Sequence, residues 1–375
     1  MRSRLFVFIS LVCLCVAIGS NDVRILEIGK GERIEVRESE KGLLKRRGVG
    51  FIDVTDHLNW PWSKNVDDEH DLPSYNYPKQ TSEVDSFENL STLIDKDEMY
   101  MNLANFCSFF TRYYKSPSGY ESALWLSEII HNITDVIPKG AVEIEHFDHK
   151  KWRQFSIIVR IPGHKTPENL VVMGSHLDSL NLIFPSWIAT PGADDNGSGT
   201  VTNLEALRVY AKHIADGNFP DNTVEFHFYS AEEGGLLGSM DVFSSYKEQE
   251  KLVVAMIQQD MTGYVRNKRD EHIGLVTDFT DPALVDFMKV IINSYASIPY
   301  RETTCGYACS DHGSAMKNGF PAAFILESEY NKTNQYIHTT MDTLDRLSFD
   351  HMAEHAKVTL GAVLELANWE FMRLT

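Results

Sequence analysis

The distribution of apolar positions predicts a domain in which strands and helices alternate. Short apolar runs bounded by polar or turn residues, as expected of buried strands, cover 155–161, 170–174, 224–229, 253–258 and 322–326. Between them, apolar residues recur at helical spacing in 201–211, 282–295 and 349–372, and earlier in 99–110 and 123–130. This alternation favours an α/β fold with three α/β/α layers and a mixed, mostly parallel central sheet.

The N-terminus has the pattern of a secretory signal peptide, which we expect to cover residues 1–19. Arg2 and Arg4 precede an apolar run over 5–18 that only Ser10 interrupts, and small residues follow. The alternative is a membrane anchor, but this run is shorter than the roughly 20 residues that a spanning helix needs. We therefore expect a protein of the secretory pathway without a membrane anchor.

Residues 20–85 differ from the rest of the chain because they are charged, rich in turn residues and poor in periodicity. This stretch is either a pro-segment or a disordered extension, and Lys45, Arg46 and Arg47 form one possible cleavage point. The sequence therefore predicts three parts: a signal peptide over 1–19, a probable pro-segment over 20–85 and a main domain over 86–375.

Charge limits the possible partners. The 375 residues include 35 basic and 53 acidic side chains and carry a net charge of −18, so the surface repels nucleic acid and anionic membranes on average. Cys305 and Cys309 stand four residues apart, a spacing that a disulfide can close in an oxidising compartment, whereas we expect Cys107 to be a buried free thiol. Glycosylation sequons occur at Asn89, Asn132 and Asn331.

Residues that can bind metals follow the predicted strands. Others lie in the glycine-rich segment 191–199 and in the threonine-containing segment 336–340. The candidates are His176 and Asp178, Asp194 and Asp195, Glu232 and Glu233, Asp260, and His338. Each motif alone also has a structural explanation, such as a surface ion pair or a helix N-cap. Together they predict a metal site, because the carboxyl ends of parallel strands meet at one edge of a sheet. Imidazole and carboxylate groups bind zinc, and a shared carboxylate can hold two ions about 3.5–4 Å apart.

These motifs, in this order and followed by the segment 305–312, resemble those of the co-catalytic zinc aminopeptidases, typified by secreted bacterial and fungal leucine aminopeptidases. The resemblance extends from about residue 86 to the C-terminus and implies the phosphorylase/hydrolase-like fold of zinc exopeptidases. It implies two Zn²⁺ ions bridged by Asp194, with His176 and Asp260 on one ion and Glu233 and His338 on the other. It also implies a cis peptide bond between Asp194 and Asp195. Because Asn196 adjoins that crowded loop, we expect its sequon to remain unmodified.

The same resemblance assigns the catalytic roles. Glu232 corresponds to the general base, Asp178 to the carboxylate that orients His176, and Tyr307 to the hydroxyl that supports the oxyanion. The implied activity is that of a secreted or lumenal metallo-exopeptidase in which two zinc ions activate hydroxide to remove an N-terminal residue. A leucine-like residue would bind a pocket formed by Met261, Val276, Cys305, Tyr307, Cys309, Phe324, Leu326, Tyr330 and Ile337.

The implied partners are peptides with a free N-terminus, and the expected oligomeric state is a monomer. The expected location is extracellular, or the lumen of a vacuole or lysosome. One alternative is a mono-zinc glutaminyl cyclase of the same fold, and another is a non-catalytic binding ectodomain. The complete ligand set and the retained Glu232 favour the peptidase over both. A carboxypeptidase would need cationic groups for a C-terminal carboxylate, and none accompanies these motifs.

Overall fold

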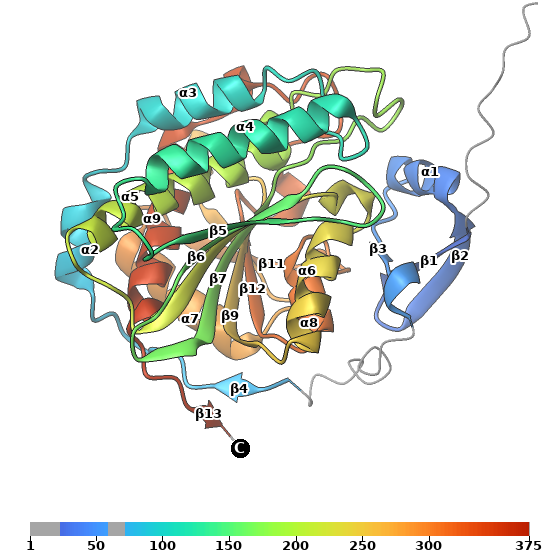
Figure 1. Cartoon of the computed structure of the whole chain (residues 1–375). Coiled ribbons are helices and arrows are strands. Elements are labelled where there is room, and N and C mark those ends of the chain that lie inside the picture. The colour runs from blue at the N-terminus through green and yellow to red at the C-terminus, as the bar shows by residue number, and fades with distance from the viewer. Residues whose placement is uncertain (1–22, 59–71, 375) are drawn as a thin grey trace, which may run out of the picture.

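A central mixed sheet organises the protein, whose computed structural model describes residues 23–58 and 72–374 (Figure 1). Within the described residues this sheet has eight strands in the order β11-β10-β12-β9-β7-β8-β6-β5. The neighbours β12, β9, β7 and β8 are parallel, as are β10 and β11, and the remaining pairs are antiparallel. The predicted fold class is confirmed. The strands are β5 (Glu143–Phe147), β6 (Ser156–Ile161), β7 (Thr166–His176), β8 (Asn222–Tyr229), β9 (Leu252–Gln259), β10 (Ile273–Val276), β11 (Tyr300–Thr303) and β12 (Ala322–Leu326).

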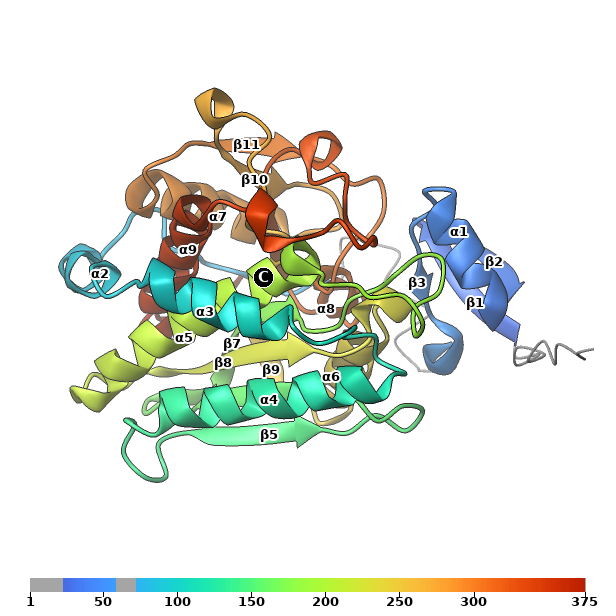
Figure 2. The ribbon, with the colours of Figure 1, turned by 90° about the horizontal axis from the view of Figure 1, so that it is seen from above.

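Helices cover both faces of the sheet because alternate side chains of the strands are apolar on each face. Val171 and Met173 of β7 pack in the large cluster under α4, α5, α7 and α9, whereas Leu170 and Val172 pack against α6 and α8 on the other face (Figures 1 and 2). The helices of these layers are α2 (Val84–Ser91), α3 (Lys96–Phe106), α4 (Pro117–Thr134), α5 (Gly199–Ala215), α6 (Leu237–Glu248), α7 (Pro282–Tyr295), α8 (His312–Lys317) and α9 (Phe349–Ala367).

The structure adds three strands that the hydrophobic pattern did not predict. The strands β5 and β11 lie at the two edges of the sheet and are largely polar, and β10 is only four residues long. Edge strands bury one face or less, so they lack the continuous apolar run of a central strand. The predicted helix over 349–372 ends early, at Ala367, and the chain then turns so that β13 (Arg373–Leu374) pairs with β4 (Ser74–Tyr75).

The first described stretch folds into a small unit that we call the N-terminal unit, residues 23–58. It consists of a three-stranded sheet of β1 (Val23–Gly29), β2 (Glu32–Arg37) and β3 (Ile52–Asp53), together with α1 (Lys41–Arg46). Figure 2 shows that it packs beside the carboxyl edge of the large sheet. These residues are therefore folded rather than a disordered extension, and apolar residues of the unit such as Ile52 and Val54 pack against the main domain.

The last part of the predicted pro-segment contacts the main domain. Residues 74–83 pack with the main domain: β4 pairs with β13, the Tyr77 hydroxyl donates to the Val254 carbonyl (2.7 Å), and the Ser82 amide donates to the Glu365 carboxylate (2.9 Å). The N-terminal unit ends at Leu58, the last described residue before the gap at 59–71. The predicted signal peptide over 1–19 lies outside the described residues.

Candidate metal centre

The predicted metal-binding side chains meet at the carboxyl edge of the parallel strands. His176 is the last residue of β7, Glu232 and Glu233 follow β8, and Asp260 follows β9. Asp195 lies in the turn before α5, and His338 comes from the long connection after β12. Residues from five segments therefore converge at one edge, as expected for an open α/β sheet.

The first group of possible ligands surrounds His176, whose side chain is completely buried. Its Nε2 atom lies 3.3 Å from Asp195 Oδ1 and 3.3 Å from Asp260 Oδ1. Glu232 Oε2 is further away, at 4.0 Å. One donor atom each of His176, Glu232 and Asp260 falls within the span that a single ion can bridge.

The second group surrounds His338. Its Nε2 atom lies 3.0 Å from Asp195 Oδ2 and 3.0 Å from Glu233 Oε1. Asp195 therefore directs one carboxylate oxygen toward each histidine and joins the two groups. This is the arrangement that a carboxylate shared between two ions requires.

The prediction that Asp194 takes this bridging position is wrong, and the structure gives the position to Asp195. The Asp194 carboxylate points away from both histidines and accepts hydrogen bonds from the Ser198 hydroxyl (3.0 Å), the Gly263 amide (3.0 Å) and the Asn334 side chain (3.0 Å). The cis peptide bond is displaced by the same single residue, to Asp195–Asn196. The resemblance therefore suggested the right motif but the wrong one of two adjacent aspartates, Asp194 instead of Asp195.

Two buried groups, Asp178 and Ser310, orient the possible ligands. Asp178 Oδ1 lies 3.3 Å from His176 Nδ1 and accepts the Glu232 amide (3.0 Å), so this carboxylate links two of the motifs. The Ser310 hydroxyl donates to Asp260 Oδ2 (2.7 Å), which leaves Oδ1 facing His176. Such outer contacts fix the direction in which a ligand atom points.

Asp342 supports the loop that carries Asp195. Its carboxylate accepts the backbone amides of Asp194 (3.0 Å) and Asp195 (3.1 Å), and burial together with the neighbouring Asp194 raises the pKa of Asp342 to about 8. The sequence analysis did not single out Asp342 or Ser310. Their only sequence signal is proximity, since Asp342 follows His338 by four residues and Ser310 follows Cys309.

The electrostatics of the centre favour a bound cation. Burial raises the pKa of Glu232 well above its ordinary value. Although burial opposes it, the carboxylates of Glu233 and Asp195 raise the pKa of His338 to about 10. In this arrangement, a positive charge near the carboxylates is strongly stabilised, whether it is carried by a proton or by a metal ion.

The residues present fit zinc. Within the described part of the chain, both ring nitrogens of His176, Glu233 Oε1 and Asp260 Oδ1 are buried atoms that make no hydrogen bond, a costly state for polar atoms unless they bind something else. The donor set contains only imidazole and carboxylate groups, which zinc accepts. His176, Asp195 and Asp260 would hold one ion, and Asp195, Glu233 and His338 would hold a second.

Part of the predicted substrate pocket forms one apolar cluster. Val276 of β10 and Phe324 of β12 are directly paired across the sheet and pack with Leu326, Cys305 and Cys309 in one cluster. These are five of the predicted pocket residues. The disulfide between Cys305 and Cys309 is present, as predicted.

The remaining predicted pocket residues lie around this cluster. The hydroxyl groups of Tyr307 and Tyr330 lie 3.4 Å apart. Ile337 directly precedes His338, and Met261 directly follows Asp260, where its carbonyl accepts the Glu327 amide (2.8 Å). Met261 and Ile337 therefore adjoin the possible ligands Asp260 and His338 along the chain.

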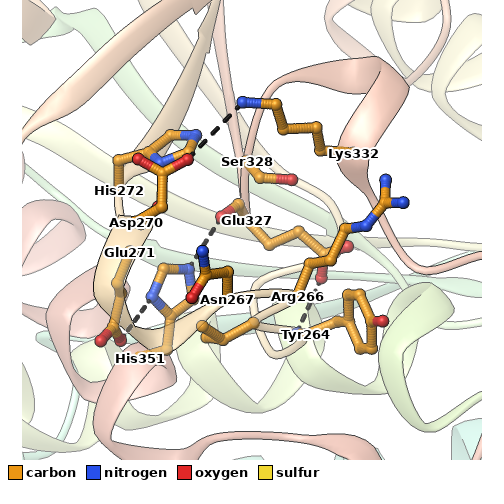
Figure 3. A pocket seen from close by; sticks show the side chains of 11 residues that line it. Tyr264, Arg266, Asn267, Asp270, Glu271, His272, Glu327, Ser328, Lys332 and His351 are labelled. Carbon is orange, nitrogen blue, oxygen red and sulfur yellow. Dashed lines mark hydrogen bonds and ion pairs between the residues drawn. The ribbon is translucent and has the colours of Figure 1, made fainter.

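A separate cavity of about 310 Å³ is lined by residues that include Tyr264, Glu327 and His351 (Figure 3). Its charged groups are paired with one another: His351 Nδ1 lies 3.1 Å from Glu271 Oε1, and Lys332 Nζ lies 3.7 Å from Asp270 Oδ2. None of the predicted site residues lines this cavity. We therefore assign it no role in binding the metal.

The N-terminal unit reaches into the centre, which the sequence analysis did not foresee. The ammonium group of Lys45, at the end of α1, lies 2.6 Å from Glu233 Oε2. Burial opposes its charge, but Glu233, Glu232 and Asp195 raise the pKa of Lys45. Next to it, the Arg46 guanidinium donates to the Leu182 carbonyl (2.7 Å), and Gly50 packs directly against the Tyr307 ring.

The remaining predicted features concern single side chains. Asn89, Asn132 and Asn331 are exposed, so their sequons are accessible, whereas Asn196 is completely buried. The Cys107 thiol makes no disulfide in the described residues, and burial raises its pKa to about 12. In the described helices we find none that is both long and apolar enough to cross a membrane.

An α/β sheet with paired histidine and carboxylate groups at its carboxyl edge defines a metal-dependent hydrolase, and the comparisons with known proteins agree. Residues 156–363 match the model of peptidase family M28. A probable aminopeptidase of Saccharomyces cerevisiae is 58% identical over 366 residues, which cover 97% of this chain and 98% of the relative. Leucine aminopeptidase 1 of Emericella nidulans is 49% identical over 92% of this chain and 88% of its own.

The similarity extends to solved structures. The LapA aminopeptidase of Legionella pneumophila superimposes with a TM-score of 0.81 and 26% identity over 93% of this chain and all of its own. A glutaminyl cyclase of Fimbriiglobus ruber shares the fold alone, with a TM-score of 0.57 at 15% identity over 72% of this chain and 95% of its own. This chain belongs to peptidase family M28, and it is an enzyme, a zinc-dependent aminopeptidase.

Proposed function

We propose that the protein is a secreted two-zinc aminopeptidase that removes bulky apolar residues, leucine-like above all, from the N-termini of peptides. The observation that carries the proposal is the position of Asp195, with one oxygen 3.3 Å from His176 Nε2 and the other 3.0 Å from His338 Nε2. The expected substrates need a free N-terminus, and we expect the protein to act as a monomer.

Bound zinc ions would act as Lewis acids that polarise the scissile carbonyl and lower the pKa of the attacking water. The protein supplies the proton transfer. The backbone amide of Glu232 donates a hydrogen bond to the Asp178 carboxylate, and the Glu232 side chain can accept a proton and return it to the leaving amine. Tyr307 lies at the pocket, where its hydroxyl can donate to the developing oxyanion. Burial raises its pKa well above the ordinary value, so the hydroxyl keeps its proton at neutral pH.

The pocket supports the proposed side-chain preference. Its wall consists of Val276, Phe324 and Leu326, all nearly completely buried, with the disulfide at its edge. Two backbone amides, of Cys305 and Gly306, donate to the Asp278 carboxylate (3.0 and 2.7 Å) and hold the disulfide loop in place. An apolar, ordered wall of this kind favours a leucine side chain over a polar one.

Chelation tests this function directly. We expect the protein to hydrolyse leucine amide, to lose that activity with 1,10-phenanthroline and to regain it when Zn²⁺ is added back. Acetylated leucine amide should not be cleaved, since it lacks a free amine. Activity that persists through chelation would contradict the metal mechanism, and cleavage of the acetylated substrate would indicate an endopeptidase.

We further propose that the N-terminal unit is a pro-segment that restrains the activity of the enzyme until it is released. Lys45 is bound to a proposed zinc ligand, and Gly50 is packed against Tyr307, so a substrate could not enter without displacing the unit. Zinc need not be displaced, because Glu233 directs Oε2 toward Lys45 and Oε1 toward His338. The unit is anchored by the Lys41 ammonium, which donates to the Gly234 carbonyl (2.9 Å), and by the Ile52 and Val54 cluster.

Replacing Lys45 by methionine is expected to raise the leucine amidase activity of the uncleaved chain by about tenfold or more. Breaking a buried ion pair typically costs several kcal/mol, which here would weaken the blocked state. Steady-state rates on the intact chain measure the effect. The control is Arg33→Met, which removes an exposed charge of the same unit far from the centre. Equal rates for the Lys45 variant and the wild type would contradict a blocking role.

The proposed location is the secretory pathway, either outside the cell or in a vacuolar or lysosomal lumen. The sequence of residues 1–19 and the disulfide between Cys305 and Cys309 support it. The alternative of a mono-zinc glutaminyl cyclase is less well supported, because the second ligand group is complete. A non-catalytic ectodomain is less well supported, because Glu232 is retained with its Oε2 atom 4.0 Å from His176 Nε2 in the first group.

A further inference from the structure

An exposed apolar loop lies next to the proposed active site. Among the described large apolar side chains, Ile183, Phe184 and Trp187 are 61%, 57% and 84% exposed, and all three fall within five residues. Single exposed apolar residues are common on protein surfaces, but a cluster of large ones usually marks a binding surface. We call residues 181–188 the rim loop.

The rim loop is ordered, so these side chains are held out toward solvent. The Asn181 side-chain oxygen accepts the amides of Ile183 (3.0 Å) and Phe184 (3.3 Å), and the Phe184 carbonyl accepts the amides of Trp187 and Ile188 (both 3.0 Å). Each of these bonds fixes the local backbone. A preformed loop loses little conformational entropy when it binds a ligand.

The base of the rim loop is fixed to the main domain by Arg112, which is completely buried. Its guanidinium donates to the Leu177 carbonyl (3.0 Å) just before the loop, and to the carbonyls of Pro191 and Gly192 (2.8 Å for Gly192) just after it. The loop therefore has a defined position relative to His176 on one side and Asp195 on the other.

The loop borders the entrance to the centre. The Leu182 amide donates to the His338 carbonyl (3.2 Å), so the rim loop contacts the connection that carries a proposed ligand. The Leu182 carbonyl accepts Arg46 of the N-terminal unit (2.7 Å). In the uncleaved chain, a segment of polypeptide is thus already seated between the rim loop and Glu233, and Figure 2 shows the loop extending toward that unit.

We propose that Ile183, Phe184 and Trp187 bind the peptide residues that follow the cleaved bond and favour substrates with apolar residues there. This inference rests on the proposed function. The first side chain would occupy the Val276 pocket. Glu232, which returns the proton to the leaving amine, is bound through its amide to Asp178, three residues before the rim loop. Because Leu182 of the rim loop donates to the His338 carbonyl and accepts from Arg46 of the N-terminal unit, we expect the leaving part of the peptide to lie along this loop.

The test compares three substrates on the intact purified chain: leucine amide, Leu-Gly-Gly and Leu-Phe-Phe. For the wild type, kcat/KM should be higher for Leu-Phe-Phe than for Leu-Gly-Gly. Trp187→Ala should reduce that ratio by about tenfold and leave the rate with leucine amide unchanged. Blocking by the N-terminal unit lowers the rates with both peptides alike, so it cancels in the ratio of their kcat/KM values measured on one preparation. Phe184→Ala provides a second variant, and Met101→Ala, at a residue of α3 outside the rim loop that is 58% exposed, is the control.

The outcomes separate the possible roles of the loop. An unchanged ratio in both rim variants would overturn the proposal, as would an equal loss on all three substrates, which indicates a structural role. If the ratio is unchanged but sedimentation shows that a wild-type dimer becomes a monomer, or vesicle binding is lost, the surface serves a second copy or a membrane instead. A wild type that hydrolyses none of the three substrates, either as the intact chain or after limited proteolysis of the N-terminal unit, would contradict the proposed function itself.

Discussion

Replacing Glu232 by glutamine is expected to lower kcat for leucine amide by about 10²–10⁴-fold, the usual contribution of a positioned acid-base group. Glutamine keeps the size of the side chain but cannot accept a proton from water or return it to the leaving amine. Burial of Glu232 beside His176 and Lys45 places its carboxylate where this transfer would occur. Steady-state kinetics on the zinc-loaded protein measure the loss.

The zinc content of this variant separates two roles for Glu232. Its Oε2 atom lies 4.0 Å from His176 Nε2, further than the oxygens of Asp195 and Asp260, so we expect the variant to bind as much zinc as the wild type. Glu121→Gln, an exposed glutamate of α4, is the matched control. A variant that keeps full activity would refute the proposed base, and one that loses a zinc ion would make Glu232 a ligand.

The second large loss of activity is expected when Asp195 is replaced. Asp195→Asn should reduce kcat/KM by about 10³-fold or more and weaken zinc binding, because the only carboxylate that faces both histidines is lost from the described centre. The neighbouring Asp194→Asn is a stringent comparison. Its carboxylate bonds to Ser198, Gly263 and Asn334, so this change should lower stability and retain zinc binding.

The pair of variants distinguishes the structure from the assignment that the sequence suggested. If Asp194→Asn loses zinc while Asp195→Asn retains it, the geometry of the centre described above is wrong. Thermal unfolding of both variants shows whether a loss of activity comes from unfolding. Zinc analysis after gel filtration then reports binding independently of catalysis.

The sequence predicted where the metal centre lies, because strand ends are easy to recognise, but it did not predict which of two adjacent aspartates binds there. The runs before His176 and Asp260 are buried on both faces and continuously apolar, and their polar ends had to meet at one edge of a parallel sheet. Asp194 and Asp195 could not be separated this way. Both are buried and adjacent, and the choice depends on the local turn, where Asp342 accepts both amides.

The contacts of the N-terminal unit could not be predicted for a different reason. Lys45 belongs to a basic cluster that also fits a cleavage site, and nothing in its neighbours indicates that it pairs with Glu233, 188 positions away. Docking of the unit depends on a few apolar residues, such as Ile52 and Val54, that form no long pattern. Long-range pairing of this kind depends on the folded surface rather than on local periodicity.

The number of zinc ions bound per chain tests the central claim most directly. Native mass spectrometry of the zinc-loaded protein should show two ions per chain for the wild type, and a single ion when His338 is replaced by alanine, because the group of Asp195, Glu233 and His338 is then incomplete. A wild type that binds only one ion at saturating zinc, or a His338 variant that still binds two, would contradict the account.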